Sequence, residues 1–578
     1  MKTTDLLAEI LKKNNLKCAF GLQGGAVVHI FDSLIKKRID VTFTHHEQSA
    51  ALAAVSYAKS VNGIGCVVVT TGPGSTNSIT GLLAAWQDSI PVIFISGQAR
   101  AIHTSYKKKV RQVGTQEVNI CDIVRPITKY TTFIYQSQNF QIEIEKAIQI
   151  AISGRPGPVW IDIALDVQWQ NISLFKKIEK VIPKKIKTNQ TKELNKSIDL
   201  INNSQNPLFI IGYGAILSGI NMKIINETLI KKSIPSVLTW NTADLIPTNN
   251  KYNLGIIGMS GQRGANKAVF NSDLIVCLGN HLSIPHTTTL YKNFAPNAKK
   301  IIINIDKDQL NNLNVKFNLK INMDCKEYLQ KIIKKLNRKK SFQLKVFKKL
   351  NWYEPKEKKH PNSNSFIRKL TSKIKSRKNI IIDGGGTALY AGFQSSVIDS
   401  KTKVTCSSSI SSMGTGLSET IGSHKSKKFL KHICIIGDGS FLMNCQDLQT
   451  IYQENVNVII IVVNNNGYLA IRHTQKEFLK ERYFGTHPSN GISFPDFSRL
   501  AKAFKIKYKK INTIEKSRKF LRNCNKVRGP IIVDLFVDES QPSLFKQGYK
   551  KDIDGSFTPS DLSEMFPFIK NPISNTNN

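Results

Sequence analysis

The sequence predicts an α/β protein with three domains, each built on a parallel β-sheet. The first observation is length, because 578 residues are too many for one hydrophobic core when about 100–200 residues per domain are usual. The second is alternation, because short apolar runs rich in Val and Ile alternate with longer helical patterns. Such βαβ units form parallel sheets covered by helices on both faces. We therefore expect three blocks with the same architecture.

The first two blocks show this alternation with few breaks. In the first, about residues 1–170, the last strand follows a Gly- and Pro-rich turn. The second, about residues 190–330, opens on an apolar run that ends in a glycine turn. Expected strands are Cys66–Thr70, Pro91–Ser96, Val159–Ile163, Pro207–Ile211, Asp273–Leu278 and Lys300–Asp306, and expected helices are Glu47–Ser60 and Ser75–Gln87.

The third block, about residues 360–540, repeats the pattern. Its expected strands lie near Asn379–Asp383, His432–Gly437, Val456–Asn464 and Pro530–Phe536. Lysine-rich runs at 176–187 and 331–360 separate the blocks and are interpreted as linkers or solvated helix faces. The predicted domains are 1–172, 190–332 and 360–545, followed by a C-terminal tail at 546–578.

Composition and charge limit the classes of function. With 41% hydrophobic and 21% charged residues, the chain is predicted to fold. Its 82 Lys and Arg against 41 Asp and Glu give a net charge of +41, which favours nucleic acid as a partner. The sequence has no zinc-finger spacing, RNP-like aromatic motif or basic-region heptad, however. We therefore interpret the charge as a lysine-biased surface and keep nucleic-acid binding only as an alternative.

The cysteines and the chain start indicate a compartment. The nine cysteines form no CxxC pair, and several lie in apolar runs, which is typical of buried thiols in a reducing environment. The first residues carry no signal-peptide pattern, and no apolar stretch is long enough to span a membrane. The sequence predicts a cytoplasmic protein with no membrane partner.

Two polar motifs follow neighbouring expected strands of the third block. Asp438 lies in Gly-Asp-Gly-Ser directly after one strand, and Asn465, 27 positions later, follows the next. Ligands of open parallel sheets collect at the carboxyl ends of the strands, so both side chains should point to one place. Carboxylate and amide oxygens suit Mg²⁺ together with phosphate oxygens, and glycine lets a phosphate approach closely. The pair predicts a metal and phosphate site, with a metal-free loop as the alternative.

These motifs, with the stretch GDGSFLMNCQDLQTI at 437–451, resemble the thiamine-diphosphate (ThDP) enzymes, in particular the acetolactate synthase/pyruvate oxidase-like group. The resemblance covers about residues 1–540 and implies pyrimidine-binding, middle and diphosphate-binding α/β domains. It implies Mg²⁺ held by the side chains of Asp438 and Asn465 and the carbonyl of Gly467. The diphosphate contacts that it implies are Gly385, Gly386, Thr387, Gly439 and Ser440.

The same resemblance assigns the pyrimidine side of the cofactor to the first block. Glu47 matches the glutamate that shares a proton with the pyrimidine ring and so activates the cofactor. A glutamate at a helix start is more often a partner of the helix dipole, but the Thr-Thr-Gly-Pro-Gly-Ser-Thr-Asn segment at 70–77 favours catalysis. Met413 matches the apolar wedge that bends the cofactor, with a core-filling methionine as the alternative. Further implied cofactor contacts are Gly24, Gly25, Gly72, Pro73 and Asn77.

The match to acetolactate synthases is weaker around the substrate. The segment at 114–117 keeps Gln116 as a hydrogen-bond donor beside the reacting carbon but lacks the family's aromatic residue. Ala164, the segment at 279–282 and Thr474 stand where the family has a lysine, an arginine-bearing segment and a tryptophan. These departures surround the acceptor pocket and the flavin site, so FAD is left undecided. Candidates to contact a carboxylate or a sugar hydroxyl are His45, His46, His281 and Arg111.

The resemblance thus predicts a ThDP- and Mg²⁺-dependent decarboxylase/carboligase that acts on a 2-keto acid such as pyruvate and gives an acyloin-type product. In the family Glu47 and the metal site come from different subunits, so we expect a homo-oligomer, at least a dimer. One alternative is a ThDP-dependent hydrolase or lyase that cleaves a C–C bond in a cyclic diketone or a sugar-derived carbonyl compound. The others are a nucleic-acid-binding protein and a homologue without catalysis.

Overall fold

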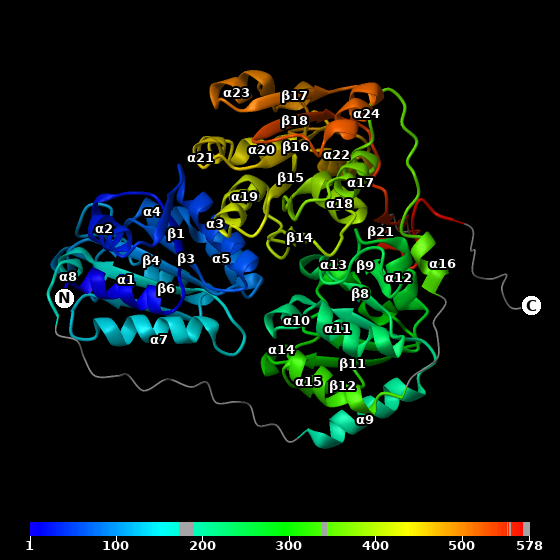
Figure 1. Cartoon of the computed structure of the whole chain (residues 1–578), viewed down its shortest axis with the longest axis horizontal. Coiled ribbons are helices and arrows are strands. Elements are labelled where there is room, and N and C mark those ends of the chain that lie inside the picture. The colour runs from blue at the N-terminus through cyan, green and yellow to red at the C-terminus, as the bar shows by residue number, and fades with distance from the viewer. Residues whose placement is uncertain (173–189, 338–343, 552, 554–556, 570–578) are drawn as a thin grey trace, which may run out of the picture.

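The structure, a computed structural model, contains three six-stranded sheets with flanking helices (Figure 1). Within each of these sheets every strand pair is parallel. The predicted α/β class is therefore confirmed. The lysine-rich run at 176–187 lies outside the described residues, which are 1–172, 190–337, 344–551, 553 and 557–569.

The first sheet is covered on both faces, because apolar residues of its central strands point into hydrophobic clusters on either side. Val67 and Phe94 pack with α3 and α5, whereas Val68 and Ile95 pack with α1, α2 and α7. The strands are β1 (Cys18–Gly21), β2 (Asp40–Phe43), β3 (Gly65–Val69), β4 (Val92–Gln98), β5 (Tyr130–Ile134) and β6 (Val159–Ala164). The helices are α1 (Thr3–Lys13), α2 (Val28–Lys36), α3 (Glu47–Val61), α4 (Pro73–Asn77), α5 (Ile79–Gln87), α6 (Ile120–Val124), α7 (Phe140–Ile152) and α8 (Leu165–Gln168). The single helix expected at Ser75–Gln87 is divided at Ser78.

The middle sheet has the same number of strands. They are β7 (Pro207–Ile211), β8 (Ser236–Leu238), β9 (Asn253–Ile256), β10 (Leu274–Leu278), β11 (Lys299–Asn304) and β12 (Leu319–Asn322). Its helices are α9 (Thr191–Asn203), α10 (Tyr213–Leu217), α11 (Met222–Thr228), α12 (Arg263–Phe270), α13 (Ile284–Thr287), α14 (Lys307–Asn311), α15 (Cys325–Ile332) and α16 (Leu344–Lys349). Part of the lysine-rich run at 331–360 packs on this domain, since Phe347 of α16 is buried in its core.

The third sheet follows at 378–536. Its strands are β13 (Lys378–Ile382), β14 (Thr402–Thr405), β15 (Lys431–Gly437), β16 (Val458–Asn464), β17 (Lys507–Ile511) and β18 (Ile531–Phe536). Its helices are α17 (Ser363–Lys373), α18 (Gly386–Ser395), α19 (Thr415–Lys425), α20 (Asp438–Met443), α21 (Asp447–Gln453), α22 (Leu469–Phe478), α23 (Phe497–Ala503) and α24 (Ile514–Asn523).

Strand order separates the middle sheet from the other two. The first sheet has the order β2-β1-β3-β4-β6-β5, and the third repeats it as β14-β13-β15-β16-β18-β17. The middle order is β12-β11-β10-β7-β8-β9, which places the first strand of the domain at the centre. All three blocks thus have the expected parallel-sheet α/β architecture, and the middle sheet differs from the other two in its strand order. Alternating strands and helices reveal parallel pairing but not the point at which the strand order reverses.

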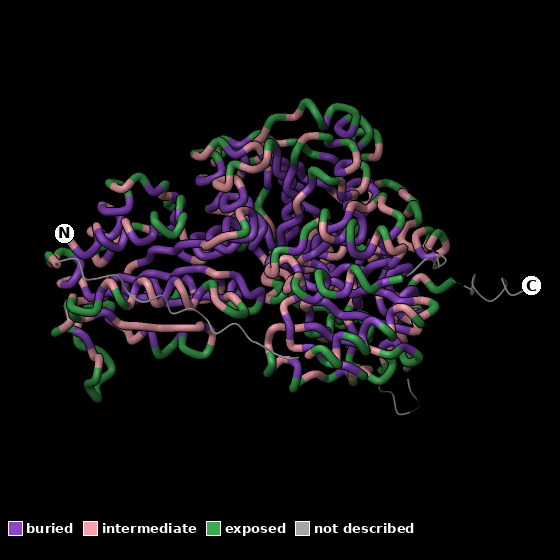
Figure 2. Tube along the Cα trace, turned by 60° about the horizontal axis from the view of Figure 1, so that its bottom comes forward, coloured by how far each residue is buried: buried purple, intermediate pink, exposed green. Residues whose placement is uncertain are grey.

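The first and third domains pack together through corresponding helices, α3 and α19, which lie side by side in Figure 1. One hydrophobic cluster runs through this contact and includes Ala54, Leu417 and Ile421. A Cβ on Gly422 would lie 1.9 Å from the Ala53 carbonyl oxygen, so this glycine permits the close helix approach. Buried segments accordingly continue from one domain into the other (Figure 2).

The described part of the C-terminal tail forms two short antiparallel pairs against the middle domain. Gln547 N–H donates to the Met259 carbonyl at 3.3 Å, and Asn293 Nδ2 donates to Asp561 Oδ1 at 3.0 Å. The pairs are β19 (Lys546–Gln547) with β22 (Met565–Phe566), and β20 (Tyr549–Lys551) with β21 (Phe557–Pro559).

Candidate functional site

Asp438 and Asn465 lie where β15 and β16, two parallel neighbours, end at one edge of the third sheet. Each residue is only 2% exposed. The Asp438 carboxylate accepts three backbone N–H groups, from Gly439 at 2.8 Å, Gly467 at 2.9 Å and Asn465 at 3.1 Å. The structure thus brings the two strand-end motifs and Gly467 together.

The oxygen atoms at this edge fit a divalent cation. Asn465 Oδ1 is buried with no hydrogen-bond partner, while Nδ2 of the same amide donates to Thr387 Oγ1 at 3.1 Å. Burial raises the pKa of Asp438 to about 6, although its three N–H donors oppose the shift. An orphaned buried acceptor is costly, and Mg²⁺ takes carboxylate and amide oxygens of this kind. In the described residues no group of three or more His, Cys, Asp or Glu could hold a metal ion, and the present set combines carboxylate and amide oxygens instead.

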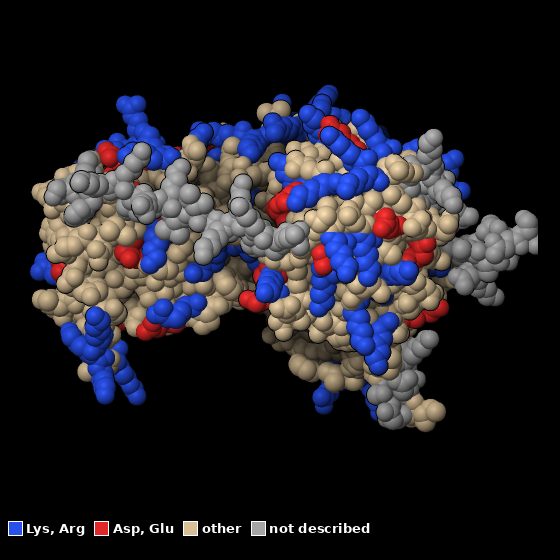
Figure 3. All heavy atoms as spheres, turned by 90° about the horizontal axis from the view of Figure 1, so that it is seen from below, with Lys and Arg blue, Asp and Glu red and all other residues tan. Residues whose placement is uncertain are grey.

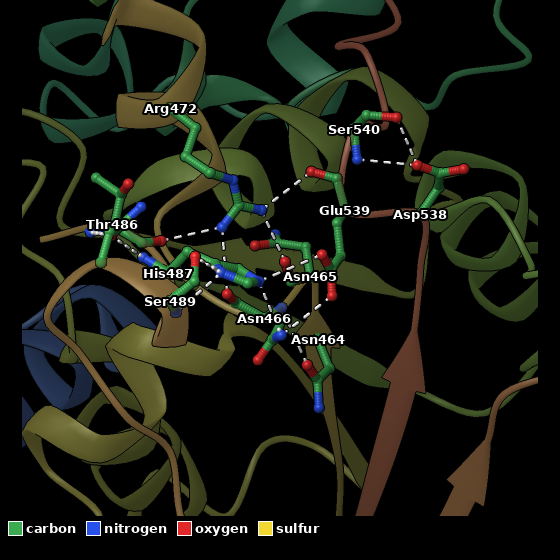
Figure 4. A network of polar contacts seen from close by, with 12 residues as sticks. Asn464, Asn465, Asn466, Arg472, Thr486, His487, Ser489, Asp538, Glu539 and Ser540 are labelled. Carbon is green, nitrogen blue, oxygen red and sulfur yellow. Dashed lines mark hydrogen bonds and ion pairs between the residues drawn. The ribbon is translucent and has the colours of Figure 1, made fainter. Parts of the chain in front are cut away.

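Arg472 of α22 fixes the backbone that follows β16 (Figure 4). A Cβ on Gly467, which has φ +137°, would lie 2.1 Å from a carbonyl oxygen of the neighbouring loop, so only glycine fits. The guanidinium donates to four backbone carbonyl oxygens at 2.8–3.2 Å, those of Asn465, Asn466, Thr486 and Glu539. The direction of the Asn465 and Gly467 peptide groups is therefore set from outside the loop.

A glycine turn after β13 lies beside this loop. The buried Asp383 carboxylate accepts Gly385 N–H at 3.3 Å and, across the turn, Gly416 N–H at 3.0 Å. A Cβ on Gly385 would lie 2.1 Å from Met413 Cγ, so the half-buried methionine covers the turn. Gly386 and Thr387, both half-buried, begin α18, and the Thr387 hydroxyl contacts Asn465.

Gly439 and Ser440 form the buried first turn of α20. Ser440 hydrogen-bonds the Asp383 carboxylate, which links this turn to the glycine turn after β13. Burial raises the pKa of Asp383 to about 6. The predicted diphosphate contacts of the third domain thus share one sheet edge with Asp438.

Glu47 begins α3 in the first domain and is 7% exposed. Its Oε2 accepts a hydrogen bond from Asn77 Nδ2 at 3.0 Å. A Cβ on Gly74 would lie 3.6 Å from Oε1, so the carboxylate faces the Gly-Pro-Gly loop. A dipole partner needs only an exposed position at the helix start, whereas this carboxylate is buried against a loop.

The loop after β3 packs against the backbone of Gln116. Gly72 has φ +63°, and a Cβ there would lie 2.4 Å from the Gln116 carbonyl oxygen. Gln116 itself has φ +60°, which is uncommon for a residue with a Cβ, and its side chain is exposed. Pro73 and Asn77, both exposed, begin and end α4. The structure therefore brings Gln116 to the loop that contacts Glu47.

Gly24 and Gly25 follow β1 at the same edge of the first sheet. Gly24 is half-buried, and a Cβ on it would lie 2.6 Å from Thr70 Cβ. Gly25 is exposed, and a Cβ on it would meet no atom within 4 Å. Gly24 therefore contacts the strand end before the Gly-Pro-Gly loop, and Gly25 faces open space.

The residues predicted to border the acceptor pocket and the flavin site stand on different elements. Ala164 is buried at the end of β6, and Thr474 on α22 donates its hydroxyl to the Ala470 carbonyl at 3.2 Å. His281 and Asn280 line a cavity of about 700 Å³ at the carboxyl edge of the middle sheet. Of the remaining candidates, His46 caps α3 by accepting Gln48 N–H, while His45 and Arg111 are exposed.

Three residues of these edges were not predicted from the sequence. Asp383 and Gln98 stand at or just after the ends of β13 and β4, so a polar residue at a strand end was the available signal. Arg472 lies on a helix, and its role depends on four carbonyl groups from separate segments. No local pattern identifies such a residue.

The positive charge is distributed over the surface. On the face seen in Figure 3, Lys and Arg side chains lie in separate groups with Asp and Glu among them. Several basic side chains are paired, such as Lys36 with Asp32 at 2.8 Å and Lys331 with Glu327 at 2.6 Å. In the described part of the chain, no helix combines the length and the apolar character needed to cross a bilayer.

Comparison with known proteins gives one consistent result. The description "Thiamine pyrophosphate enzyme" matches in three parts, as N-terminal TPP binding domain at 1–123, central domain at 194–332 and C-terminal TPP binding domain at 384–535. A probable acetolactate synthase large subunit of Methanococcus aeolicus is 30% identical over 573 residues, covering 93% of this chain and 92% of that protein. The acetolactate synthase large subunit of Pyropia yezoensis is 31% identical over 558 residues, with 93% and 92% covered. The isozyme 2 large subunit of Escherichia coli is 28% identical over 552 residues, with 93% and 96% covered.

Proposed function

The chain belongs to the thiamine pyrophosphate (thiamine diphosphate, ThDP) enzymes, and on that premise we propose that it is a ThDP- and Mg²⁺-dependent decarboxylase/carboligase of the acetolactate synthase type. Its substrate is pyruvate or a related 2-keto acid, and its product is of the acyloin type. When bound, ThDP supplies the electron sink that decarboxylation requires. The observation that carries the proposal is the orphaned Asn465 Oδ1 beside the buried Asp438 carboxylate.

In this proposal Asp438, Asn465 and the Gly467 carbonyl hold Mg²⁺. The unpartnered Oδ1 and the raised pKa of Asp438 support this assignment, because a divalent cation satisfies the first and lowers the second. Backbone N–H groups and hydroxyls nearby would bind the diphosphate oxygens, and Met413 would support the cofactor. The residues proposed for the diphosphate are Gly385, Gly386, Thr387, Gly439 and Ser440.

Glu47 holds the proton that is exchanged with the pyrimidine ring. Its burial and its hydrogen bond from Asn77 support this role, because both keep the carboxylate in one orientation. A buried carboxylate is also shielded from solvent protons between exchanges. The residues proposed to line the ring are Gly24, Gly25, Gly72, Pro73 and Asn77.

Gln116 donates a hydrogen bond to the substrate. Its amide is exposed and has no hydrogen-bond partner among the described residues, so it is available to a carbonyl or carboxylate oxygen. The neighbouring Gly72 loop supports its placement beside the cofactor's ring.

We also propose that the site is shared between subunits of a homo-oligomer, at least a dimer. Large apolar side chains are exposed on segments that flank both halves of the site, and such surfaces mark interfaces. They include Ile102 at 70%, Val113 at 46%, Met443 at 48% and Phe484 at 56% exposed. Sedimentation velocity with ThDP and Mg²⁺ should give a dimer or a larger species. A fully active monomer would contradict the shared site.

Three further features complete the proposal. The domain limits are 1–172, 190–332 and 360–545 with a tail at 546–578. A cytoplasmic location is supported by the nine cysteines, all free and eight of them buried. The cavity of about 700 Å³ is where FAD would bind. Decarboxylation and carboligation need no flavin, so activity does not show whether FAD is bound. The absorption spectrum of the purified protein tests for bound FAD.

The test is to incubate the protein with pyruvate, ThDP and Mg²⁺ and to measure CO₂ and the acyloin-type product. We expect both to form and to disappear without ThDP. Cleavage of a cyclic diketone without CO₂ release would favour the hydrolase alternative. Absence of any ThDP-dependent reaction with 2-keto acids would contradict the proposed function.

A further inference from the structure

A row of buried polar side chains connects β4 and β6 in the interior of the first sheet. Asp162 is 3% exposed and accepts Ser96 Oγ–H at 2.6 Å and Gln98 Nε2–H at 3.0 Å. Ser96 Oγ in turn accepts Trp160 Nε1–H at 2.8 Å. Burial raises the pKa of Asp162 to about 7, against which the two hydrogen bonds act. Polar groups persist inside a sheet only when bonded in this way.

Gln98 uses every hydrogen-bonding position of its amide. Nε2 donates to Asp162 and to the Val118 carbonyl at 2.8 Å. Oε1 accepts Thr71 Oγ1–H at 2.7 Å and Ala99 N–H at 2.9 Å. An amide offers two donor hydrogens and two acceptor sites, so none is left over. A flipped amide would set its oxygen against the Asp162 carboxylate, and the orientation is therefore fixed.

The partners of Gln98 lie on both sides of Gln116. Val118 is two residues later in the chain, and Thr71 Oγ1 lies 3.1 Å from the Gln116 carbonyl oxygen. Between them, the Glu117 carboxylate accepts N–H groups of the same loop at 2.8 and 3.2 Å. The backbone of Gln116 keeps its uncommon φ of +60° inside this set of contacts. A strained residue persists where its surroundings determine its conformation several times over.

We propose that Gln98 is a positioning residue that acts through Gln116. Gln98 connects the rigid strands β4 and β6 to the loop that carries Gln116 and so fixes the position of the Gln116 amide. The hydrogen bond to Asp162 holds Gln98 in place. The inference rests on the proposed function, in which Gln116 contacts the 2-keto acid. Gln98 does not itself face the substrate, because all four of its amide positions are occupied by protein groups.

The test is a double-mutant cycle with Gln98→Met and Gln116→Ala. Met has a similar length and no amide, so it removes the hydrogen bonds with little change in volume. We expect Gln98→Met to lower kcat/KM for pyruvate about 10–100-fold, the cost of misplacing a catalytic group by about 1 Å. In the Gln116→Ala background it should have no further effect. Wild-type kinetics for Gln98→Met, or losses that multiply in the double variant, would overturn the proposal.

Ser96→Ala is the matched control. It removes the other hydrogen bond to Asp162 and leaves the contacts from Gln98 to Thr71 and Val118 in place. We expect a lower melting temperature but kcat/KM within about 3-fold of wild type. If Ser96→Ala lowered kcat/KM as much as Gln98→Met does, the row of polar side chains would contribute only to stability, and the positioning role of Gln98 would be overturned.

Hydrogen–deuterium exchange separates this inference from the proposed function. Exchange at residues 113–118 should be faster in Gln98→Met than in Ser96→Ala, whether or not the wild-type protein decarboxylates pyruvate. Equal exchange would overturn the positioning role, whereas an inactive wild type would overturn only the function. If Gln98→Met does not fold, Thr71→Val gives the same comparison, since it removes only the hydroxyl between Gln98 and Gln116.

Discussion

The first and third sheets share one strand order, but corresponding strand ends carry different chemistry. After β15 the third sheet has Asp438, whereas after the corresponding β3 the first sheet has the uncharged Gly-Pro-Gly loop. After β16 stands Asn465, and at the end of the corresponding β4 stands Gln98. The carboxylate of the first domain, Glu47, comes instead from the start of a helix.

The two strand-end amides show what this difference means. Asn465 Oδ1 has no protein partner, although it is buried. Gln98 is equally buried, and all four of its hydrogen-bonding positions are occupied. A buried polar atom without a hydrogen-bond partner is suited to bind a ligand, whereas a side chain with all its hydrogen bonds made is suited to fix the positions of neighbouring residues. The unpartnered oxygen supports the binding role proposed for the third sheet edge, and the fully bonded amide supports the positioning role proposed for the first.

Glu47→Gln gives the largest expected effect and separates the two roles. The amide keeps the size of the side chain but cannot exchange the proton, so turnover of pyruvate should fall at least about 10³-fold. Binding of ThDP with Mg²⁺ should stay within about 3-fold, because the third domain is unchanged. Carbon dioxide release and calorimetric ThDP titration measure the two quantities. Wild-type CO₂ release by the variant would sink the assignment of Glu47.

Asp438→Asn tests the other edge. The loss of the carboxylate charge should weaken ThDP binding at fixed Mg²⁺ at least about 10-fold, since even residues behind a metal ligand are worth 10–100-fold. Asp447→Asn is the control, because Asp447 is also a fully buried aspartate of the third domain. We expect Asp447→Asn to alter stability without altering ThDP affinity. Calorimetry showing the same ThDP affinity in Asp438→Asn and wild type would refute the metal role.

Glycine substitutions compare the backbones of the two edges. Gly72→Ala should lower the free energy of unfolding by about 1–3 kcal/mol, because φ is +63° and the new Cβ would meet the Gln116 carbonyl at 2.4 Å. Gly437→Ala should change it by less than about 0.5 kcal/mol, because φ is −78° and no atom lies within 4 Å. Urea unfolding followed by circular dichroism measures both. If the two substitutions lowered the free energy of unfolding equally, a side chain at position 72 would not strain the turn.

A pH-dependent effect on stability is expected at the contact between α3 and α19. Burial raises the pKa of Glu419 to about 7 from 4.5, although Lys59 and Ser407 oppose the shift. The folded state thus keeps a proton that the unfolded state releases, so this contribution to stability is full below pH 4.5 and is lost as the pH rises through 7. The slope is at most about 1.4 kcal/mol per pH unit. Glu419→Gln should remove this dependence in unfolding experiments between pH 5 and 8, and an unchanged slope would exclude Glu419 as its source.

Local sequence was sufficient to predict much of the fold and the strand ends at which the candidate site residues lie. The composition of long apolar runs such as β15 and β16 is enough to predict strands. The polar residue that follows each run can then be read directly from the sequence. Edge strands were missed because they are short or polar, as with β17, in which the three lysines are exposed and only Ile511 is buried. The order of the middle sheet and the contacts of Arg472 depend on segments far apart in the chain. No periodicity within one segment records them.

The central claim is that Glu47 activates a cofactor that the Asp438 edge binds. The most direct measurement is the rate at which the C2 proton of bound ThDP exchanges with deuterium, followed by NMR after acid quench. We predict rapid exchange in the wild-type holoprotein and exchange at least about 10³-fold slower in Glu47→Gln with ThDP and Mg²⁺ bound. Equal exchange rates in the two holoproteins would contradict the division of roles between the two sheets.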